Sequence, residues 1–404
     1  MYREDVPTTR SACGEQIMKN LEYFIGRPRV SVVYNKQVFF SQVNLKMLRL
    51  TLTATAALSA SALGNQDITF DDYITLHHKI YTDDVEYASR QLHFKETQAN
   101  VIKQNAAYTA GLSTWWAEIN EYADRNPTEL SMKKIKQPIP FDKHHKLNVA
   151  TPFTEKKTNT NPSSKTWIEN QSPVKNQGMC GSCWAFATTE VVESYLSIAE
   201  NGTKPEVLAP QTLVSCMKNP QSCGGTGGCE GAIAELGFNY TQHYGLALLS
   251  DFPYTAKDTK CLKYSEAVTC SGFVKNKQND VNALETAIAT QGPVAITVSA
   301  NWATYGGGIF SDGCANIEGY SCSLDHAVVA VGYTKDYWLV RNSWGAAWGE
   351  AGYIRLTRKY DNTTFTDKQP KSGVACKPYP SVQYPMGESG ILFDTSYPTG
   401  VKRG

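Results

Sequence analysis

The chain has 404 residues, long enough for two or three domains, and its apolar fraction of 41% and charged fraction of 19% are ordinary for a globular protein. The formal net charge of +1 implies no general attraction to nucleic acids or to membrane surfaces. No segment is long and apolar enough to predict a membrane span. All eleven cysteines except Cys13 lie between positions 180 and 376, which indicates disulfides and an oxidising compartment.

The N-terminal part contains a segment typical of secreted proteins. Residues 1–46 carry mixed charge and no motif, so they form an extension of unclear role. Residues 47–64 have a basic start formed by Arg49 and the preceding Lys46, continue with an apolar run and include the small-residue cleavage site Ala60-Ser61-Ala62. This is the layout of a secretory signal peptide, which stands at the start of a chain. We therefore expect Met47 to be the true start, with an ordinary Ala-rich internal segment as the alternative.

A long charged helix is predicted within residues 66–135. Six of its residues are spaced by 3 or 4 positions and so share one helix face, namely Glu86, Arg90, Phe94, Thr97, Val101 and Asn105. By itself, such a stripe indicates only the solvent-facing side of a long helix. A second short motif, Asn120-x-Tyr122-x-Asp124, follows it.

Residues 151–165 are polar and interrupted by prolines, so they cannot form a core and are predicted to be a linker. Beyond this linker, the chain is first helical and rich in cysteine, and then rich in strands. Asp280 can cap a helix, and the predicted strands are 293–299, 326–333, 337–342 and 352–357. A helical half followed by a β half predicts an α+β protein of two packed lobes.

The segment Gln177–Ala187 carries the strongest candidate for chemistry. A glycine-containing turn precedes Cys183, from which an amphipathic helix is predicted to run to a stop at Asn201-Gly202. A thiol at a helix start lies near unpaired N–H groups and the positive end of the helix dipole, which favours the nucleophilic thiolate. The alternative for Cys180 and Cys183 is a thiol-redox pair or half of a zinc site.

A cysteine nucleophile needs a base, and histidine titrates in the suitable pH range. Five of the seven histidines precede the linker. His243 lies in a polar stretch and is predicted to be on the surface. His326 opens an apolar strand, which is where a residue of a cleft belongs. His326 is therefore the candidate base.

Several motifs together resemble the papain-like cysteine peptidases. Cys180-Gly-Ser-Cys183-Trp184 matches the family signature around the nucleophile. Asn342-Ser-Trp344-Gly matches the segment that carries the family's orienting asparagine. The helical stripe resembles the propeptide pattern of papain-like zymogens, with departures at two of its positions, and the motif that ends at Asp124 resembles the second propeptide motif.

The resemblance implies a precursor of the cathepsin L or papain type. Its parts would be an inhibitory propeptide at 65–150, an activation linker at 151–165 and a two-lobed mature peptidase domain at 166–404. Such an enzyme is a monomeric endopeptidase that acts on proteins and peptides without a metal or other cofactor, and its own propeptide inhibits it. A non-catalytic binding protein on the same fold is the rival interpretation.

The resemblance also implies the role of each site residue. Cys183 attacks the peptide carbonyl, His326 shuttles protons and Asn342 orients His326, while Trp344 shields their hydrogen bond from water. The Gln177 amide and the Cys183 backbone N–H hold the oxyanion.

Further positions correspond to the family's substrate-binding surface. These are Gly231, Ala232 where the family usually has glycine, Ile233, Thr297, Ala327 and Trp344. The floor of the pocket for the second residue before the scissile bond is Asp394 if Ser389 occupies the family's last cysteine position, and Ser381 if Cys376 does. A carboxylate there would accept an Arg or Lys side chain.

Cysteine pairing follows the family only in part. Cys180 with Cys229 and Cys216 with Cys261 match two family disulfides. The pairing of Cys223, Cys270, Cys314, Cys322 and Cys376 stays open, and since their number is odd, one is free or bridges elsewhere. Four glycosylation sequons, at Asn170, Asn201, Asn239 and Asn362, agree weakly with secretion or with a lysosomal or vacuolar destination.

Overall fold

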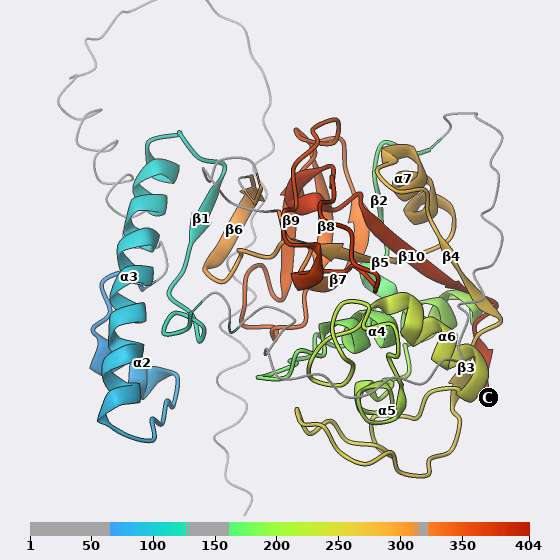
Figure 1. The fold of residues 1–404 in the computed structure, drawn as a ribbon. Helices are drawn as coiled ribbons and strands as arrows, with labels where there is room; N and C mark the ends of the chain where they lie inside the picture. Colours follow the sequence, from blue (N-terminus) through green and yellow to red (C-terminus); the bar gives the residue numbers. More distant parts are fainter. Residues whose placement is uncertain (1–64, 127–128, 130–160, 312, 315–321) are drawn as a thin grey trace, which may run out of the picture. The chain divides into compact units, whose positions relative to one another are not determined.

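The computed structural model describes residues 65–126, 129, 161–311, 313–314 and 322–404, which Figure 1 draws in colour. Several predicted segments lie wholly or partly outside these described residues. They are the extension 1–46, the signal-like segment 47–64, the end of the predicted helical region at 130–135 and most of the linker 151–165. Within the described ranges, no helix is long and apolar enough to cross a membrane.

The N-terminal region contains α2 (Phe70–Leu76), α3 (Asp84–Thr109) and the short strand β1 (Trp115–Ala117). The Asp83 side chain caps α3 by accepting a hydrogen bond from the Glu86 N–H. The predicted stripe does share one face, because Phe94, Val101 and Asn105 are buried and its other members are half-buried. The Asn105 side chain bonds to both backbone polar groups of Ala117, at 3.0 and 2.8 Å, and so fastens α3 to β1.

The helical lobe consists of α4 (Cys183–Ala199), α5 (Pro210–Cys216) and α6 (Ala234–Tyr244), with the short 3₁₀ turn η2 (Ile168–Asn170) beside α4. Helix α4 ends at Ala199, just before the predicted stop at Asn201 and Gly202, whose φ angles of 60° and 79° reverse the chain. The helix is buried nearly all round rather than amphipathic, because it packs against α5, α6 and the sheet of the other lobe.

The β lobe is one sheet of nine strands within the described residues, in the order β1-β6-β9-β8-β7-β5-β10-β4, with β2 added beside β7. Only β6 and β9 are parallel to each other. The strands are β2 (Lys165–Thr166), β4 (Gly272–Lys275), β5 (Val294–Val298), β6 (Tyr305–Phe310), β7 (His326–Tyr333), β8 (Tyr337–Arg341), β9 (Tyr353–Thr357) and β10 (Asp394–Thr399). A separate pair joins β3 (Val268–Thr269) to β11 (Lys402–Arg403).

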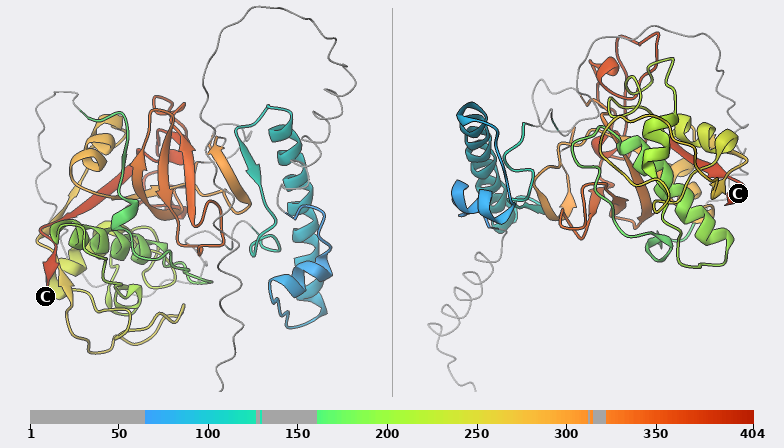
Figure 2. Two further views of the ribbon diagram at one scale, coloured as in Figure 1. Left: turned by 180° about the vertical axis from the view of Figure 1, so that it is seen from behind. Right: turned by 90° about the horizontal axis from the view of Figure 1, so that it is seen from below.

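The predicted helix before the sheet is α7 (Val281–Thr290), and Asp280 caps it by accepting from two backbone N–H groups. All four predicted strand segments form strands in the sheet. Each is a short apolar run whose side chains are buried on one face or on both faces of the sheet. Figures 1 and 2 show α4, α5 and α6 gathered in one lobe and the sheet in the other, with α3 beyond β1. The fold is therefore the α+β, two-lobed architecture that the sequence predicts, and a hydrophobic core lies on each side of the lobe boundary.

The N-terminal region is seated on the β lobe through β1. Strand β1 pairs with β6, where Trp116 lies opposite Gly307. A Cβ at Gly306 would come within 2.2 Å of the Trp116 ring, so the glycine run of β6 makes room for this indole. Beyond β1, the Tyr122 hydroxyl donates to the Trp344 carbonyl at 3.0 Å. The N-terminal region therefore contacts Trp344, in the segment that follows the candidate residue Asn342.

Four disulfides lie within the described residues. Cys180–Cys229 and Cys216–Cys261 are the two pairs that the resemblance implies. The others are Cys223–Cys376 and Cys314–Cys322, and Cys270 is the free, buried cysteine of the five left open. Cys376, which one of the two C-terminal alignments places at the family's last cysteine position, is thus bonded to Cys223. A redox pair of Cys180 with Cys183 is wrong, because Cys180 is bonded to Cys229.

Candidate active site

The candidate nucleophile and the candidate base meet at the boundary between the lobes. Cys183 is the first residue of α4, and His326 is the first residue of β7. The N–H of Ala327, next to His326, donates to the Cys183 sulfur at 3.5 Å. The start of a helix in one lobe thus faces the start of a strand in the other, and both side chains are fully buried.

Asn342 holds the imidazole of His326 in a defined orientation. The Nε2 atom of His326 lies 2.8 Å from Asn342 Oδ1, and the carbonyl oxygen can only accept, so Nε2 carries the proton. The Nδ1 atom has no hydrogen-bond partner among the described residues and is left as a proton acceptor. Trp344 stacks on the imidazole with ring centroids 4.9 Å apart, and so keeps water from the His326–Asn342 bond.

Hydrogen bonds hold both the nitrogen and the oxygen of the Gln177 side-chain amide. Its Nε2 donates to the Cys180 carbonyl at 3.0 Å, while its Oε1 accepts from the Ser343 hydroxyl at 2.6 Å. The backbone N–H of Gln177 donates to the Ser343 carbonyl at 2.8 Å. Because Oε1 is occupied by Ser343, the amide nitrogen faces the turn before Cys183, and one of its two hydrogens is left for a substrate oxygen.

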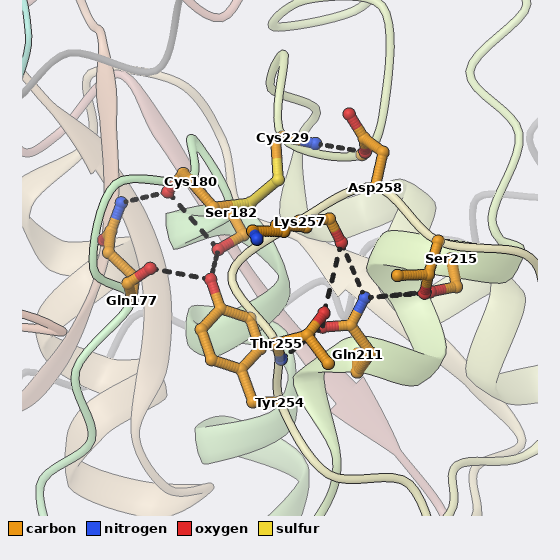
Figure 3. The surroundings of a disulfide bond; sticks show 12 residues. Gln177, Cys180, Ser182, Gln211, Ser215, Cys229, Tyr254, Thr255, Lys257 and Asp258 are labelled. Carbon is orange, nitrogen blue, oxygen red and sulfur yellow. Dashed lines mark hydrogen bonds between the residues drawn. A yellow bond between two sulfur atoms is a disulfide. The ribbon is translucent and has the colours of Figure 1, made fainter.

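Two residues near Gln177 had not been singled out from the sequence. Ser343 fixes the amide, and its position between Asn342 and Trp344 in the motif is a signal that could have found it. Tyr254 donates to the Gln177 carbonyl at 2.7 Å and lies 2.6 Å from the Ser182 hydroxyl, as Figure 3 shows beside the Cys180–Cys229 disulfide. Nothing in the sequence around Tyr254 signals this contact.

The ionisation of Cys183 and His326 differs from the one expected from the sequence. Burial raises the pKa of the Cys183 thiol to about 12, although the N–H groups of Ala327 and of the helix start act in the opposite direction. Burial also lowers the pKa of His326 to about 4, against the effect of its bond to Asn342. The expectation of a populated thiolate is therefore not borne out in this structure, because loss of water outweighs the helix dipole.

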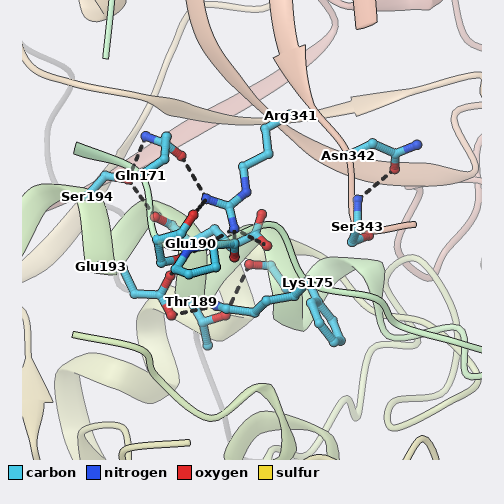
Figure 4. A network of polar contacts seen from close by, with 12 residues as sticks. Gln171, Lys175, Thr189, Glu190, Glu193, Ser194, Arg341, Asn342 and Ser343 are labelled. Carbon is cyan, nitrogen blue, oxygen red and sulfur yellow. Dashed lines mark hydrogen bonds and ion pairs between the residues drawn. The ribbon is translucent and has the colours of Figure 1, made fainter. Parts of the chain in front are cut away.

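A buried ion cluster stabilises the end of β8, which immediately precedes Asn342. Arg341 is fully buried and pairs with Glu190 of α4 at 3.0 Å. Nearby, Glu193 of α4 pairs with Lys175 and accepts from the Leu208 N–H at 2.7 Å. Figure 4 shows both pairs side by side beneath the end of β8. This cluster joins the two lobes directly behind Asn342.

The expected substrate-binding residues lie on both sides of the boundary. Gly231, Ala232 and Ile233 immediately precede α6 in the helical lobe. In the sheet, Thr297 lies opposite both Ala327 and Asp394 on the neighbouring strands. This register supports the later C-terminal alignment, and Ser381 lies instead in the long segment between β9 and β10. Trp344 covers His326 as described above.

The carboxylate of Asp394 is not free. Its Oδ2 accepts from the Thr297 hydroxyl at 2.8 Å, and its Oδ1 pairs with Lys275 Nζ at 2.6 Å. Lys275 also pairs with Glu235 at 3.2 Å. Burial, together with the charge of Asp394, raises the pKa of Glu235. An open carboxylate that accepts a basic substrate side chain is therefore not what the structure contains.

The remaining polar candidates are His243 and any group of side chains that could hold a metal ion. His243 is exposed, and its Nδ1 lies 2.8 Å from the Asn239 carbonyl oxygen of its own helix, so it is outside the site as predicted. Within the described ranges, no group of three or more His, Cys, Asp or Glu side chains is placed to hold a metal ion.

Comparison with known proteins agrees with this geometry. The family described as "Papain family cysteine protease" matches residues 161–374, and the "Cathepsin propeptide inhibitor domain (I29)" matches residues 70–130. A "Cathepsin L-like proteinase" from Phaedon cochleariae is 33% identical over 332 residues, which cover 78% of this chain and 97% of the relative. "Cathepsin L" from Sarcophaga peregrina is 31% identical over 337 residues, covering 78% and 96%.

A solved structure, that of the digestive procathepsin L2 proteinase from Tenebrio molitor larval midgut, matches with a TM-score of 0.65 and 28% identity over 82% of this chain and 98% of that one. A thiol-redox protein and a non-catalytic binding protein are not favoured by these likenesses. The chain belongs to the papain family of cysteine proteases and is a cathepsin L-like cysteine endopeptidase made as a zymogen with a propeptide inhibitor domain.

Proposed function

We propose that Cys183, His326, Asn342 and Gln177 carry out peptide hydrolysis in the mature enzyme. His326 Nδ1 takes the thiol proton as the Cys183 sulfur attacks the substrate carbonyl. The oxyanion that forms accepts hydrogen bonds from the Gln177 amide and the Cys183 backbone N–H. When the C–N bond breaks, His326 returns the proton to the leaving amine, and an acyl-enzyme remains on the sulfur.

Water completes the cycle. His326 takes a proton from the water as its oxygen attacks the thioester, and the same proton returns to the sulfur when the C–S bond breaks. Asn342 keeps Nδ1 directed at both reactions through its bond to Nε2. The observation that carries the proposal is this 2.8 Å bond beside a sulfur held by the Ala327 N–H. Hydrolysis of a blocked dipeptide amide by acid-activated protein tests it: thiol alkylation should stop hydrolysis, and full activity after alkylation would overturn the proposal.

The propeptide carries an acid-sensitive anchor at Asp124. The hydroxyls of Tyr73 and Tyr81 donate to its two oxygens at 2.8 and 2.9 Å, and Lys79 pairs with it at 3.0 Å. Burial alone raises the pKa of Asp124, but Lys79 and the hydroxyls outweigh burial and hold the pKa below its usual value. Because the folded pKa is lowered, the anchor is complete above the ordinary value of 3.8 and is lost as pH falls through the folded pKa.

We therefore expect the wild-type precursor to release its propeptide only below about pH 4. Asp124→Asn removes the charge that Lys79 needs and should weaken the inhibition by about 1–3 kcal/mol, or roughly ten- to a hundredfold. Activation of this variant should begin at higher pH. The rate at which activity appears between pH 3 and 7 measures the effect. Glu86, which bonds Thr82 nearer the surface, should contribute less.

Asp71→Asn is the matched control, because Asp71 is exposed and its side chain accepts a hydrogen bond from the Tyr87 hydroxyl at the surface. Identical activation profiles for Asp124→Asn and Asp71→Asn would contradict the anchor. N-terminal sequencing of the product locates the cut. Since Asn161 and Pro162 already bond to α7 and β7, we propose that the cut falls between 151 and 160.

The ion pair of Asp394 predicts the preference for the second residue before the scissile bond. Since Lys275 occupies the carboxylate, we propose that the enzyme prefers Phe or Leu there and disfavours Arg. Lys275→Met should free Asp394 and raise kcat/KM for an Arg substrate roughly tenfold or more relative to its Phe counterpart, since a charge-assisted hydrogen bond contributes about 1.5–3 kcal/mol.

Lys277→Met is the control for this exchange. Lys277 is largely exposed and pairs with Asp280 outside the pocket, so its loss should leave the Arg-to-Phe ratio unchanged. The assignment of the pocket floor fails if Lys275→Met leaves the ratio at the wild-type value, or if only Ser381 variants change it.

The disulfides support a proposal for the cellular compartment of the protein. We propose that the protein passes through the secretory pathway to the outside or to a lysosome- or vacuole-type compartment, because four disulfides require oxidising conditions to form. Of the four sequons, Asn201 and Asn362 are exposed and could carry glycans, whereas the half-buried Asn170 bonds Ser197. We propose a monomer that binds protein and peptide substrates and its own propeptide.

A further inference from the structure

The two donors that we assign to the oxyanion lie at the two ends of one short loop. Gln177 is its first residue, and Cys183, the first residue of α4, is its last. The middle of the loop is fixed to Cys229, through the Cys180–Cys229 disulfide and a hydrogen bond of 3.0 Å from the Gly181 N–H to the Cys229 carbonyl. Since an oxyanion is a single atom, the two donors stabilise it together only if the ends of the loop keep a fixed separation.

The hydroxyl group of Tyr254 joins these two ends. It donates to the Gln177 carbonyl oxygen at 2.7 Å and lies 2.6 Å from the hydroxyl oxygen of Ser182, the residue before Cys183. A phenol has one hydrogen and a carbonyl oxygen can only accept, so this hydrogen goes to Gln177 and the Ser182 hydroxyl donates to Tyr254. Figure 3 shows the Tyr254 hydroxyl between these two residues. One hydroxyl thus connects the residue that carries the first donor to the neighbour of the residue that carries the second.

The side chain of Tyr254 is held in place and stays protonated. Its ring packs edge-on against Phe186 of α4, three residues after Cys183, with ring centroids 4.8 Å apart and an interplanar angle of 88°. Burial raises the pKa of Tyr254 to about 12, although the hydrogen bond with Ser182 acts in the opposite direction. The hydroxyl is therefore a donor throughout the acid and neutral range, and its position is fixed relative to the start of α4.

The segment that follows Tyr254 is fastened to the same loop at a second point. The Asp258 carboxylate accepts from the Cys229 N–H at 2.8 Å. A Cβ at Gly228 would collide with the accepting oxygen, so the glycine makes room for this carboxylate. Residues 254–258 therefore support the loop at its ends through Tyr254 and at its middle through Cys229, the disulfide partner of Cys180.

We propose that Tyr254 is a positioning residue of the oxyanion site, whose hydroxyl keeps the Gln177 amide and the Cys183 N–H at the separation that the oxyanion requires. This inference rests on the proposed function, because it concerns the two donors assigned there. Without the hydroxyl, the Gln177 carbonyl and the Ser182 hydroxyl lose their shared partner, and the two ends of the loop can move relative to each other. The oxyanion exists only in the transition state, so this movement lowers kcat and leaves substrate binding nearly unchanged.

The variant Tyr254→Phe keeps the ring and its contact with Phe186 and removes only the hydroxyl. In the acid-activated variant, kcat for a blocked dipeptide amide should fall about tenfold, with KM within about twofold of the wild-type value. The rate of alkylation of Cys183 by iodoacetamide is the second readout. Alkylation displaces iodide from a saturated carbon and forms no oxyanion, so its rate constant should equal that of the wild type.

Tyr264→Phe is the matched control, because it removes a hydroxyl of the same kind from the same lobe. The Tyr264 hydroxyl lies 2.8 Å from the Tyr240 hydroxyl and 3.3 Å from the Gly245 carbonyl oxygen, so these partners belong to α6 and the residue that follows it. Its loss should leave kcat at the wild-type value. An unchanged kcat in Tyr254→Phe, or an equal fall of kcat in Tyr264→Phe, would overturn the proposal. An equal fall of kcat and of the alkylation rate in Tyr254→Phe would also overturn it, because the thiol itself would then be disturbed.

Ser182→Ala removes the other half of the contact, and it replaces Tyr254→Phe if that variant does not fold. It should lower kcat severalfold with an unchanged alkylation rate, and an unchanged kcat would overturn the proposal. In the double variant Tyr254→Phe/Ser182→Ala, kcat should equal that of Tyr254→Phe alone, because both changes break the same connection. Falls of kcat that multiply would mean two independent effects and would contradict the proposal. Absence of hydrolysis in the wild type would overturn the proposed function itself, and this inference with it.

Discussion

Replacement of Cys183 by alanine should abolish peptide hydrolysis, with a loss of at least about 10⁴-fold in kcat/KM, because no other described residue of the site can form the acyl-enzyme. The measurement is turnover of a blocked dipeptide substrate after acid treatment of the precursor. Since the variant cannot cleave itself, its propeptide must be removed by a small amount of wild-type enzyme before the assay.

Cys270→Ala is the control for the loss of a thiol. Cys270 is the other free cysteine of the described ranges, and it is buried in the core of the helical lobe, where its sulfur lies 3.5 Å from the Phe238 carbonyl oxygen. This variant should keep its activity per folded molecule. Retained activity in Cys183→Ala, or loss of activity in a folded Cys270→Ala, would contradict the assignment of the nucleophile.

Replacement of Gln177 by alanine should lower kcat by about 10²–10³-fold with little change in KM, because the amide stabilises charge that exists only in the transition state. Ser343→Ala should have a smaller effect of the same kind. It leaves the donor in place and removes only the 2.6 Å bond that fixes the amide's orientation. Ser343 is in this sense a positioning residue.

Steady-state kinetics separate this role from a general loss of packing. Gln211→Ala serves as the control, since Gln211 is a buried glutamine whose amide bonds Lys257 and Ser215, away from the catalytic pair, in the region that Figure 3 also shows. A rise in KM with unchanged kcat in Gln177→Ala would contradict an oxyanion role. So would equal losses of kcat in the Gln177 and Gln211 variants.

The parts of the site that the sequence predicts are those set by local signals. The helix from Cys183 and the strand from His326 each follow from a short pattern, and both begin at the predicted residue. Elimination of five histidines by their position left only two candidates, and the strand pattern distinguished them. The motif around Asn342 supplied the partner of His326, and the 2.8 Å contact agrees with it.

The parts that could not be predicted depend on contacts between distant segments. Lys275 and Asp394 are ion-paired because β4 and β10 are neighbours in the sheet, which no local pattern reveals. The Cys223–Cys376 pair is one of many possible connectivities, since cysteine positions alone do not determine pairing. Strand β1 and its glycine-rich partner β6 escaped notice because neither has the β-branched pattern of a strand.

The ionisation state of Cys183 likewise could not be predicted from a local sequence pattern. A helix start was expected to favour the Cys183 thiolate, and its N–H groups do act in that direction. The burial of the sulfur in the precursor is a property of the whole fold, and it outweighs the local effect. Burial thus favours the neutral thiol and the neutral imidazole, and we expect the thiolate fraction to rise when water reaches the pair in the mature enzyme.

We propose that Cys183 is a nucleophile that the precursor keeps inactive. Intact-mass measurement of precursor and acid-activated protein, each after brief treatment with iodoacetamide at neutral pH, tests it most directly. We expect no rapid adduct on the precursor and one rapid adduct on the activated enzyme, located at Cys183 by peptide mapping and accompanied by complete loss of activity. Equal labelling of Cys183 in both forms, or activity that survives the single adduct, would contradict it.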